Sequence, residues 1–357
     1  MNTNITLETV KVIVDTDTGV DDAAAIAWLL SQTKYEVAVL GITTVNGNTD
    51  ARNAANNVLT VMDAVGRRDI PVLIGADKPL LQDVPKTGSL MHGPDGLWFV
   101  GQGNPHDLER LSDDVPEFLC SNAAADVKLI ALGPLTNIAQ AYAHCPERMR
   151  LYSEIVVLGG AKYGGNISAT AEFNFWADPE AVEQVLCSGL NLRIIPMDTF
   201  DTFTLSMADI DRLMEGTAVA QLLSPALKQY AAIQLGLGGA IAAGVPDVTA
   251  VMIALDEQLL IEEQPALVKI MPGGVKNPQR LVRGQSIIGL NMAQKVPMIA
   301  AEAELNELAL RTFTEPGFNL ETELDRILER EPDNAHIILD IDEKQMHHLF
   351  MHYLMTP

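Results

Sequence analysis

The chain has 357 residues, 48% of them hydrophobic, and a formal net charge of −23. A chain this acidic is a poor partner for nucleic-acid backbones and for anionic membranes. It also contains no apolar run of about 20 residues, the length that a transmembrane helix requires. We therefore expect a globular protein that binds neither nucleic acid nor a membrane.

The cysteines and the first residues bear on the compartment. Cys120, Cys145 and Cys187 form no CxxC pair, and their odd number argues against a disulfide framework. Residues 1–4 lack the basic region and apolar stretch that begin a secretory signal peptide. Both observations favour a cytoplasmic protein.

Short apolar runs alternate with helix-forming stretches through the first half of the chain. This alternation predicts an α/β fold with a mostly parallel central sheet flanked by helices. The predicted strands are 12–14, 37–44, 72–74, 127–132, 155–158 and 192–197, and the predicted helices between them are 23–30, 51–65, 134–143 and 178–187.

The second half has a different pattern. Residues 206–243 read as mainly helical, and a strand pair is expected at 266–271 and 286–290. Residues 300–334 are acidic and predict an irregular, exposed insertion, followed by a strand at 337–340 and a helix at 343–355. Because no linker or internal repeat is visible, we expect one domain over residues 1–357.

Four carboxylates lie within eight residues after the first predicted strand, at Asp15, Asp17, Asp21 and Asp22. Four anions this close repel one another unless a cation lies among them, and no Lys or Arg occurs at positions 12–33. All-oxygen ligands favour Ca²⁺ or Mg²⁺ over zinc. Capping of the next helix is an alternative role for Asp21 and Asp22, but it does not account for the other two.

The acidic run at 15–22, DTDTGVDD, resembles the N-terminal fingerprint of the inosine–uridine nucleoside N-ribohydrolases. The resemblance implies a Rossmann-like nucleoside hydrolase fold and Ca²⁺-dependent hydrolysis of the N-glycosidic bond of a ribonucleoside. It also implies a homodimer or homotetramer. Six further blocks match the family in the same order, at 42–48, 92–96, 131–137, 157–160, 171–174 and 178–181.

The same resemblance implies a set of calcium ligands that is spread along the chain. Asp247, which follows Pro246, matches the distal ligand, although a helix cap is the simpler reading of that residue taken alone. A main-chain carbonyl ligand falls at Leu132, where any side chain is acceptable. The implied ligands are Asp15, Asp17, Asp22, Leu132 and Asp247.

Recognition of ribose requires hydrogen-bonding groups, because the sugar presents hydroxyls and no charge. Two of the candidates, Asn48 and Asn166, lie beside glycines, so turn formation is an alternative role for them. No GxxxxGK[ST] phosphate loop occurs, which favours a nucleoside over a nucleotide. By resemblance the substrate-binding residues are Asp21, Asn48, Asn166, Glu172, Phe173, Asn174 and Gln234.

The resemblance also assigns the chemistry. Asp17 is the expected general base acting on a calcium-bound water. Many family members place a His, the acid for the leaving base, where this chain has Pro246, and proline cannot donate a proton. His92, Tyr230 and Gln234 are the candidate replacements, of which we expect His92 and Tyr230 to be catalytic.

Two other functions remain open. Haloacid dehalogenase-type phosphohydrolases also begin with strand-Asp-x-Asp, but they have Thr or Val where this chain has Gly19. A nucleoside-binding protein that has lost turnover is the second alternative, because the leaving-group His is missing. The first would release phosphate, and the second would bind a nucleoside without releasing sugar.

Overall fold

The computed structural model describes residues 9–81, 88–101, 106–237, 242–274 and 281–356. Nine strands form one sheet in the order β10-β9-β11-β6-β5-β4-β1-β2-β3. The strands from β11 to β3 run parallel, and β9 and β10 are antiparallel additions at one edge. The strands are β1 (Val10–Thr16), β2 (Val37–Thr44), β3 (Val72–Ile74), β4 (Val127–Ala131), β5 (Glu154–Leu158), β6 (Leu192–Ile195), β9 (Leu260–Met271), β10 (Gln285–Gly289) and β11 (Ala335–Ile341).

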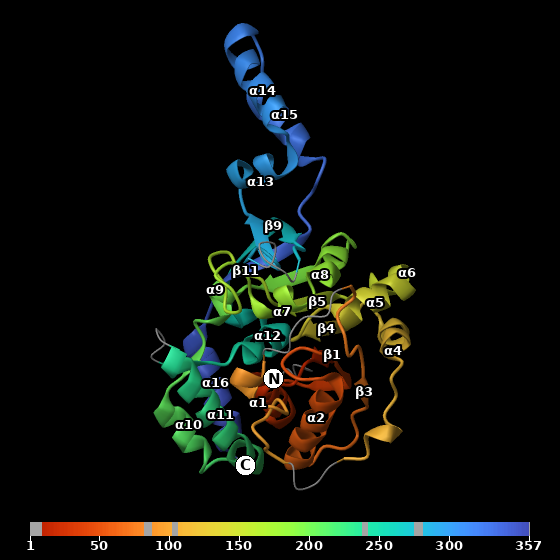
Figure 1. The fold of residues 1–357 in the computed structure, drawn as a ribbon, viewed down its shortest axis with the longest axis vertical. Helices are drawn as coiled ribbons and strands as arrows, with labels where there is room; N and C mark the ends of the chain where they lie inside the picture. Colours follow the sequence, from red (N-terminus) through yellow and green to blue (C-terminus); the bar gives the residue numbers. More distant parts are fainter. Residues whose placement is uncertain (1–8, 82–87, 102–105, 238–241, 275–280, 357) are drawn as a thin grey trace, which may run out of the picture.

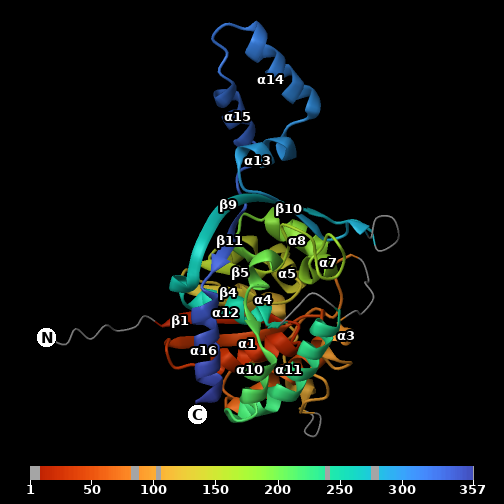
Figure 2. The ribbon, with the colours of Figure 1, turned by 90° about the vertical axis from the view of Figure 1, so that its left-hand side faces the viewer.

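Helices cover both faces of the sheet (Figures 1 and 2). One hydrophobic cluster joins α1, α2, α11, α12 and α16 to one face, and a second joins α4, α5 and α8 to the other. The helices of the sheet domain are α1 (Val20–Ser31), α2 (Ala51–Val65), α3 (Ser89–His92), α4 (Val115–Asn122), α5 (Thr136–His144), α6 (Pro146–Met149), α7 (Phe173–Ala177), α8 (Pro179–Leu186), α9 (Met197–Phe200), α10 (Met207–Leu213), α11 (Ala218–Leu237), α12 (Pro246–Leu255) and α16 (Glu343–Met355).

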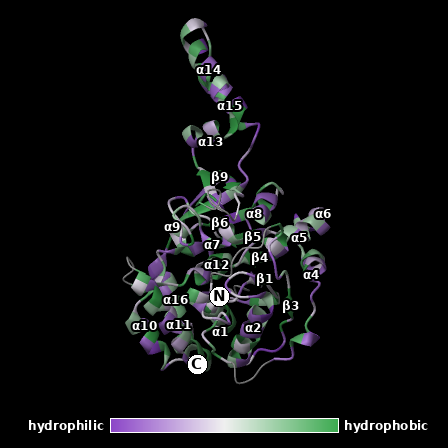
Figure 3. Cartoon of the chain, in the orientation of Figure 1, coloured by the Kyte–Doolittle hydropathy of each residue, from purple (hydrophilic) through white to green (hydrophobic). Residues whose placement is uncertain are grey.

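The most buried helices are α1 and α12, which lie side by side against the sheet. Residues 20–30 of α1 and 247–255 of α12 are all buried. Figure 3 shows this part of the molecule as predominantly hydrophobic. A helix that is apolar on all sides must be enclosed by other elements. The acidic residues at the N-termini of these two helices are therefore drawn into the interior with them.

The predicted fold class is confirmed, as is the alternation of strands and helices in the first half. Helix α1 begins at Val20, earlier than predicted, and β9 begins at Leu260 instead of residue 266. Small elements complete the chain: the pair β7 (Thr204–Leu205) and β8 (Ala243–Gly244), and the 3-10 helices η1 (Leu108–Arg110) and η2 (Glu257–Leu259).

The prediction of an irregular segment at 300–334 is wrong. Most of that segment is helical, in α14 (Glu302–Thr314) and α15 (Leu320–Leu328), which follow α13 (Met292–Ile299). These three helices, called the hairpin below, project from the β9–β10 edge (Figures 1 and 2). They share a small core of their own that includes Val296, Leu308 and Ile327.

The cysteine count argued against a disulfide framework, but the described residues contain one disulfide. Cys120 at the end of α4 and Cys145 after α5 are bonded, with their Cα atoms 6.2 Å apart. Cys187 is free. The two bonded cysteines are 25 residues apart in the chain, and the packing of α4 against α5 brings them together. Among the described helices, none is both long and apolar enough to cross a membrane.

Candidate active site

The site lies where the order of the parallel strands reverses. β1 has β2 and β3 on one side and β4, β5 and β6 on the other. Ligands of open α/β sheets bind at the carboxyl ends of the strands at such a point. A cavity of about 660 Å³ opens there. Eleven of the predicted site residues line it: Asp21, Asn48, His92, Leu132, Asn166, Glu172, Phe173, Asn174, Tyr230, Gln234 and Asp247.

Three carboxylates converge beside the cavity, and two of them, those of Asp21 and Asp247, line it. One oxygen each of Asp21, Asp22 and Asp247 lies within 4.8 Å of the other two, and all three residues are buried. Asp21 and Asp22 come from the first turn of α1, and Asp247 comes from the first turn of α12. Asp21 had been predicted to bind substrate, so the structure adds it to the candidate metal ligands.

The electrostatics of this group fit a cation. Burial, followed by repulsion from Asp21, raises the pKa of Asp22 to about 6. Burial and then Asp22 raise the pKa values of Asp17 and Asp247 well above the ordinary range. Asp17 Oδ1 and Asp21 Oδ1 are buried without a hydrogen-bond partner. No Lys or Arg is among the described residues lining the cavity, so those residues supply no permanent positive charge there.

Asp17 is fixed with one oxygen committed and one available. Its Oδ2 accepts a 2.6 Å hydrogen bond from the Asn48 main-chain N–H. The loops at Gly47 and Gly133 pass so close to the carboxylate that an added Cβ at either position would contact it. The glycines therefore allow the backbone to enclose Asp17 while its Oδ1 stays free.

Asp22 both caps α1 and faces the converging carboxylates. Its Oδ1 accepts a 2.6 Å bond from the Thr16 hydroxyl, and its Oδ2 accepts bonds from Gly19 N–H at 2.8 Å and Asn48 Nδ2 at 3.2 Å. The capping alternative and the ligand role are therefore compatible for this residue.

Asp15 lies outside the three converging carboxylates. Its Oδ1 accepts hydrogen bonds from the Thr43 hydroxyl at 2.5 Å and from Asn137 Nδ2 at 2.7 Å. Burial raises its pKa to about 7, against the lowering effect of those two bonds. In this arrangement Asp15 ties β1 to β2 and α5 beneath the site.

The sugar-binding candidates on α7 are held by main-chain contacts. Glu172 caps α7, where its carboxylate accepts bonds from the N–H groups of Asn174, Phe175 and Gly160. Burial nevertheless raises the pKa of Glu172 to about 7. Asn174 Nδ2 donates to the carbonyls of Leu132 at 2.7 Å and Leu158 at 3.0 Å. The amide of Asn174 is therefore oriented by the ends of β4 and β5.

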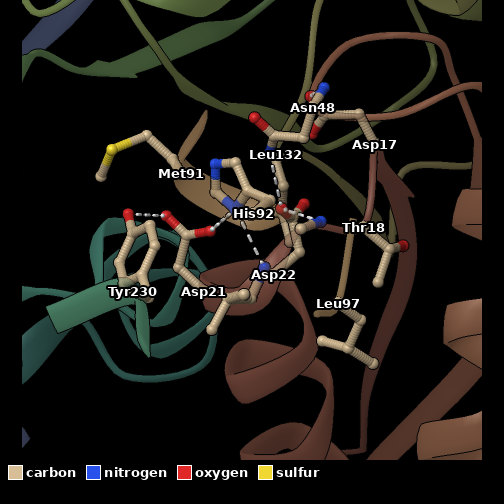
Figure 4. Close-up of polar contacts among 12 residues, drawn as sticks. Asp17, Thr18, Asp21, Asp22, Asn48, Met91, His92, Leu97, Leu132 and Tyr230 are labelled. Atoms are coloured by element: carbon tan, nitrogen blue, oxygen red, sulfur yellow. Dashed lines mark hydrogen bonds and ion pairs between the residues drawn. The ribbon is translucent and has the colours of Figure 1, made fainter. Parts of the chain in front are cut away.

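His92 and Tyr230 meet Asp21 at the side of the cavity (Figure 4). The Tyr230 hydroxyl donates to Asp21 Oδ2 at 2.9 Å, and the ring centroids of Tyr230 and His92 are 5.2 Å apart. His92 Nδ1 accepts a 3.1 Å bond from Val20 N–H, so its ring proton belongs on Nε2. Burial lowers the pKa of His92, which favours this neutral form.

Other cavity residues have roles that the sequence did not show. Gln234 bonds Gly244 twice, through Oε1 at 2.8 Å and Nε2 at 3.2 Å, so its amide anchors β8 to α11. Asp201, just after α9, lines the cavity but was not predicted. Its only sequence signal is its position after the strand at 192–195, because strand ends gather at this edge.

The fold and site together define an α/β protein with an acidic, cation-compatible pocket. A family model described as inosine-uridine preferring nucleoside hydrolase matches residues 12–348. An enzyme of that name from Crithidia fasciculata is 30% identical over 261 residues, which cover 71% of this chain and 81% of that protein. The chain therefore belongs to the inosine-uridine preferring nucleoside hydrolase family.

The chain spans less than two thirds of the length of two other curated relatives. An uncharacterized protein of Schizosaccharomyces pombe is 38% identical over 192 residues, covering 53% of this chain and 61% of that protein. Uridine nucleosidase 1 of Arabidopsis thaliana is 34% identical over 227 residues, covering 62% of this chain and 66% of that protein. A solved plant nucleoside hydrolase shares the fold, with a TM-score of 0.79, 24% identity, and coverage of 97% of this chain and 99% of that one.

Proposed function

We propose that the chain hydrolyses ribonucleosides to ribose and a free base in a Ca²⁺-dependent reaction. The observation that carries the proposal is the convergence of Asp21, Asp22 and Asp247, of which Asp21 and Asp247 line the cavity. The described cavity residues include no Lys or Arg. This absence favours a neutral nucleoside over a phosphorylated substrate and weighs against the phosphohydrolase alternative.

The converging carboxylates, Asp17 and the Leu132 carbonyl are the groups that would hold the cation. They offer only oxygen ligands, which suits Ca²⁺. When bound, the cation supplies positive charge that orients and acidifies water. It would also offset the mutual repulsion that raises the pKa values of Asp17, Asp22 and Asp247.

The chain's own residues then divide the work. Asp17 Oδ1, which has no protein partner, is placed to take a proton from water. Glu172 and Asn174 are anchored at the ends of neighbouring strands and bind sugar hydroxyls. Asn48 and Asn166 also bind the sugar, and Phe173 lines the same cavity. In this arrangement, water attacks one face of the sugar and the base departs from the other face.

The departing base accepts a hydrogen bond from a donor on the side of the cavity where His92 and Tyr230 lie. Pro246 occupies the first turn of α12 and has no donor to offer. We assign the task to His92, since its Nδ1 is occupied by Val20 N–H and its Nε2 carries the proton. Tyr230 orients Asp21 through its 2.9 Å hydrogen bond. If turnover has been lost together with the leaving-group His, the chain is the nucleoside-binding protein considered above.

The test is release of reducing sugar from inosine, guanosine, uridine, cytidine and adenosine, with added Ca²⁺ or with a chelator. We expect sugar release that the chelator abolishes, and about one calcium per chain by elemental analysis. Phosphate release from a phosphomonoester, or nucleoside binding without sugar release, would instead support one of the alternatives. The homodimer or homotetramer and the cytoplasmic location stay predictions, to be tested by sedimentation and cell fractionation.

A further inference from the structure

Asp201 places a carboxylate in the cavity away from the converging carboxylates. It follows α9 directly and lines the cavity together with Phe200 and Thr204. A Cβ built on Gly244 would lie 4.0 Å from Asp201 Oδ1 and 3.9 Å from Gln234 Oε1. The carboxylate therefore borders the wall that β8 and α11 form just before Pro246.

This carboxylate has no bonding partner among the residues that the structure describes. The neighbouring Asp198 accepts hydrogen bonds from the N–H groups of Lys162 at 2.6 Å and Tyr163 at 3.0 Å, and no such bond reaches the side chain of Asp201. The groups that act on Asp201 electrostatically are themselves acidic, namely Asp198 and Glu172. Asp201 is exposed, so water or a bound ligand can donate to it where the described residues do not.

A structural role does not account for the side chain. The main-chain N–H of Asp201 closes α9 by donating to the Met197 carbonyl, a bond that any residue except proline could make. Its carboxylate caps no described helix. An ionised carboxylate accepts hydrogen bonds and cannot donate them. A ligand donor would satisfy it, whereas a ligand carbonyl or anion in the same place would be repelled.

We propose that Asp201 is a specificity-determining residue that accepts a hydrogen bond from a donor group of the bound nucleoside. This inference rests on the function proposed above. The donor has two possible sources. The first is the 5′-hydroxyl of the ribose, because Asp201 is near enough to Glu172, a proposed sugar-binding residue, to act on it electrostatically. The second is the 2-amino group of a purine base, because Asp201 also borders Gly244.

Two substrate pairs distinguish the sources. Inosine and 5′-deoxyinosine differ only in the 5′-hydroxyl, and guanosine and inosine differ only in the 2-amino group. A site built to bond a donor rejects the analogue that lacks it. We therefore expect the wild type to favour the donor-bearing member of one pair by about tenfold or more in kcat/KM, as expected for a bond to a charged acceptor.

The variants are Asp201→Asn and Asp201→Ala, with Asp211→Asn on α10 as a control that removes one exposed charge outside the cavity. Both Asp201 variants should reduce the favoured ratio to within about threefold, leaving the other pair unchanged. Asp211→Asn should change neither ratio. The pair that responds identifies the donor.

The inference is overturned if the wild type favours neither donor-bearing substrate. It is also overturned if the preference of the wild type persists in both Asp201 variants. Either result leaves nucleoside hydrolysis intact. If the wild type releases no sugar at all, the proposed function fails separately. The same ratios are then measured as dissociation constants by calorimetry with Ca²⁺ present, where a ratio that persists without Asp201 again overturns the inference.

Discussion

The chain has two acidic regions in which the pKa values of carboxyl groups are shifted in opposite directions. In the site, Asp17, Asp22 and Asp247 are buried, and burial followed by mutual repulsion raises their pKa values. In the hairpin, Glu304 pairs with Arg330, and that bond lowers the pKa of the carboxyl group. Carboxylates of the hairpin have cationic partners, whereas the described residues that line the cavity include no Lys or Arg. Net charge alone cannot show this difference, because it counts both regions equally.

The largest expected effect comes from the site. Asp17→Asn keeps the shape of the side chain but cannot accept a proton from water at neutral pH. We expect turnover to be abolished, with a loss of at least about 100-fold in kcat, because a general base normally contributes that much. The measurement is kcat for sugar release at saturating nucleoside and Ca²⁺.

The matched control is Asp325→Asn, the same change at an exposed position of α15. It should leave kcat unchanged, and both variants should keep the circular dichroism spectrum of the wild type. If Asp17→Asn retained activity within about tenfold of wild type, Asp17 would not be the sole base. The carboxylates of the site and of the hairpin would then differ less in their importance for turnover than we propose.

The next effect concerns the leaving group. His92→Ala should lower kcat on inosine and uridine by about tenfold to 100-fold, because it removes the proposed donor. Tyr230→Phe should cost less, since it removes only the hydrogen bond that orients Asp21. Pro246→His should change little if His92 already serves the leaving base. A faster Pro246→His enzyme, with the other two variants unaffected, would show that no replacement donor exists.

The pH dependence of stability gives a smaller difference. Burial raises the pKa of Glu172 from 4.5 to about 7, so the folded protein keeps a proton that the unfolded chain releases. The stability from this group is complete below about pH 4.5 and is lost as the pH rises through 7, by at most about 3 kcal/mol. Relative to Glu172→Gln, the wild type should therefore lose several degrees of Tm between pH 5 and pH 8.

The measurement is the Tm of both proteins in saturating Ca²⁺, where the other carboxylates contribute equally and cancel in the difference. Glu304→Gln is the control from the hairpin. The pKa of Glu304 is lowered, so this carboxyl group stabilises the wild type at neutral pH and loses that effect as the pH falls. Relative to Glu304→Gln, the wild type should therefore lose stability at low pH, the opposite of the trend expected for Glu172. A parallel pH response of Glu172→Gln and wild type would mean that Glu172 is ionised in the folded protein.

The sequence predicted the strand–helix alternation and the acidic site, because both depend on local pattern. The run at 15–22 is contiguous, and the ends of parallel strands necessarily meet at one edge. It did not predict the partners of each carboxylate. Asp15 is bonded by Thr43 and Asn137, which come from different elements, and Asp21 joins Asp247 through the packing of α1 beside α12.

The errors in the prediction have the same origin. In the segment at 300–334, the charged residues obscured the helical spacing of Leu305 and Leu308 and of Leu324 and Ile327, which form the small core of the hairpin. The disulfide between residues 120 and 145 depends on how two helices pack, which the number of cysteines cannot reveal. Tertiary contacts decided each of these features.

The smallest effect is expected when the hairpin is removed. No described hairpin residue lines the cavity, and the hairpin has its own core. Gly289 pairs with Leu267 and Ala335 pairs with Ala266, so the two cut ends flank β9. The gap is about two strand spacings, or roughly 10 Å, which a Gly-Ser linker of about eight residues can bridge.

Replacing residues 291–332 with this linker should keep kcat/KM within about threefold of wild type. The Tm should fall by only a few degrees, because the ion pair between Lys269 and Glu331 at 2.7 Å is half-exposed and exposed pairs contribute about 1 kcal/mol or less. Asn334 is retained, since its side chain bonds the main chain of Val268. A loss of activity beyond about tenfold in a folded variant would show that the hairpin acts on the site, and the two acidic regions would then not be independent.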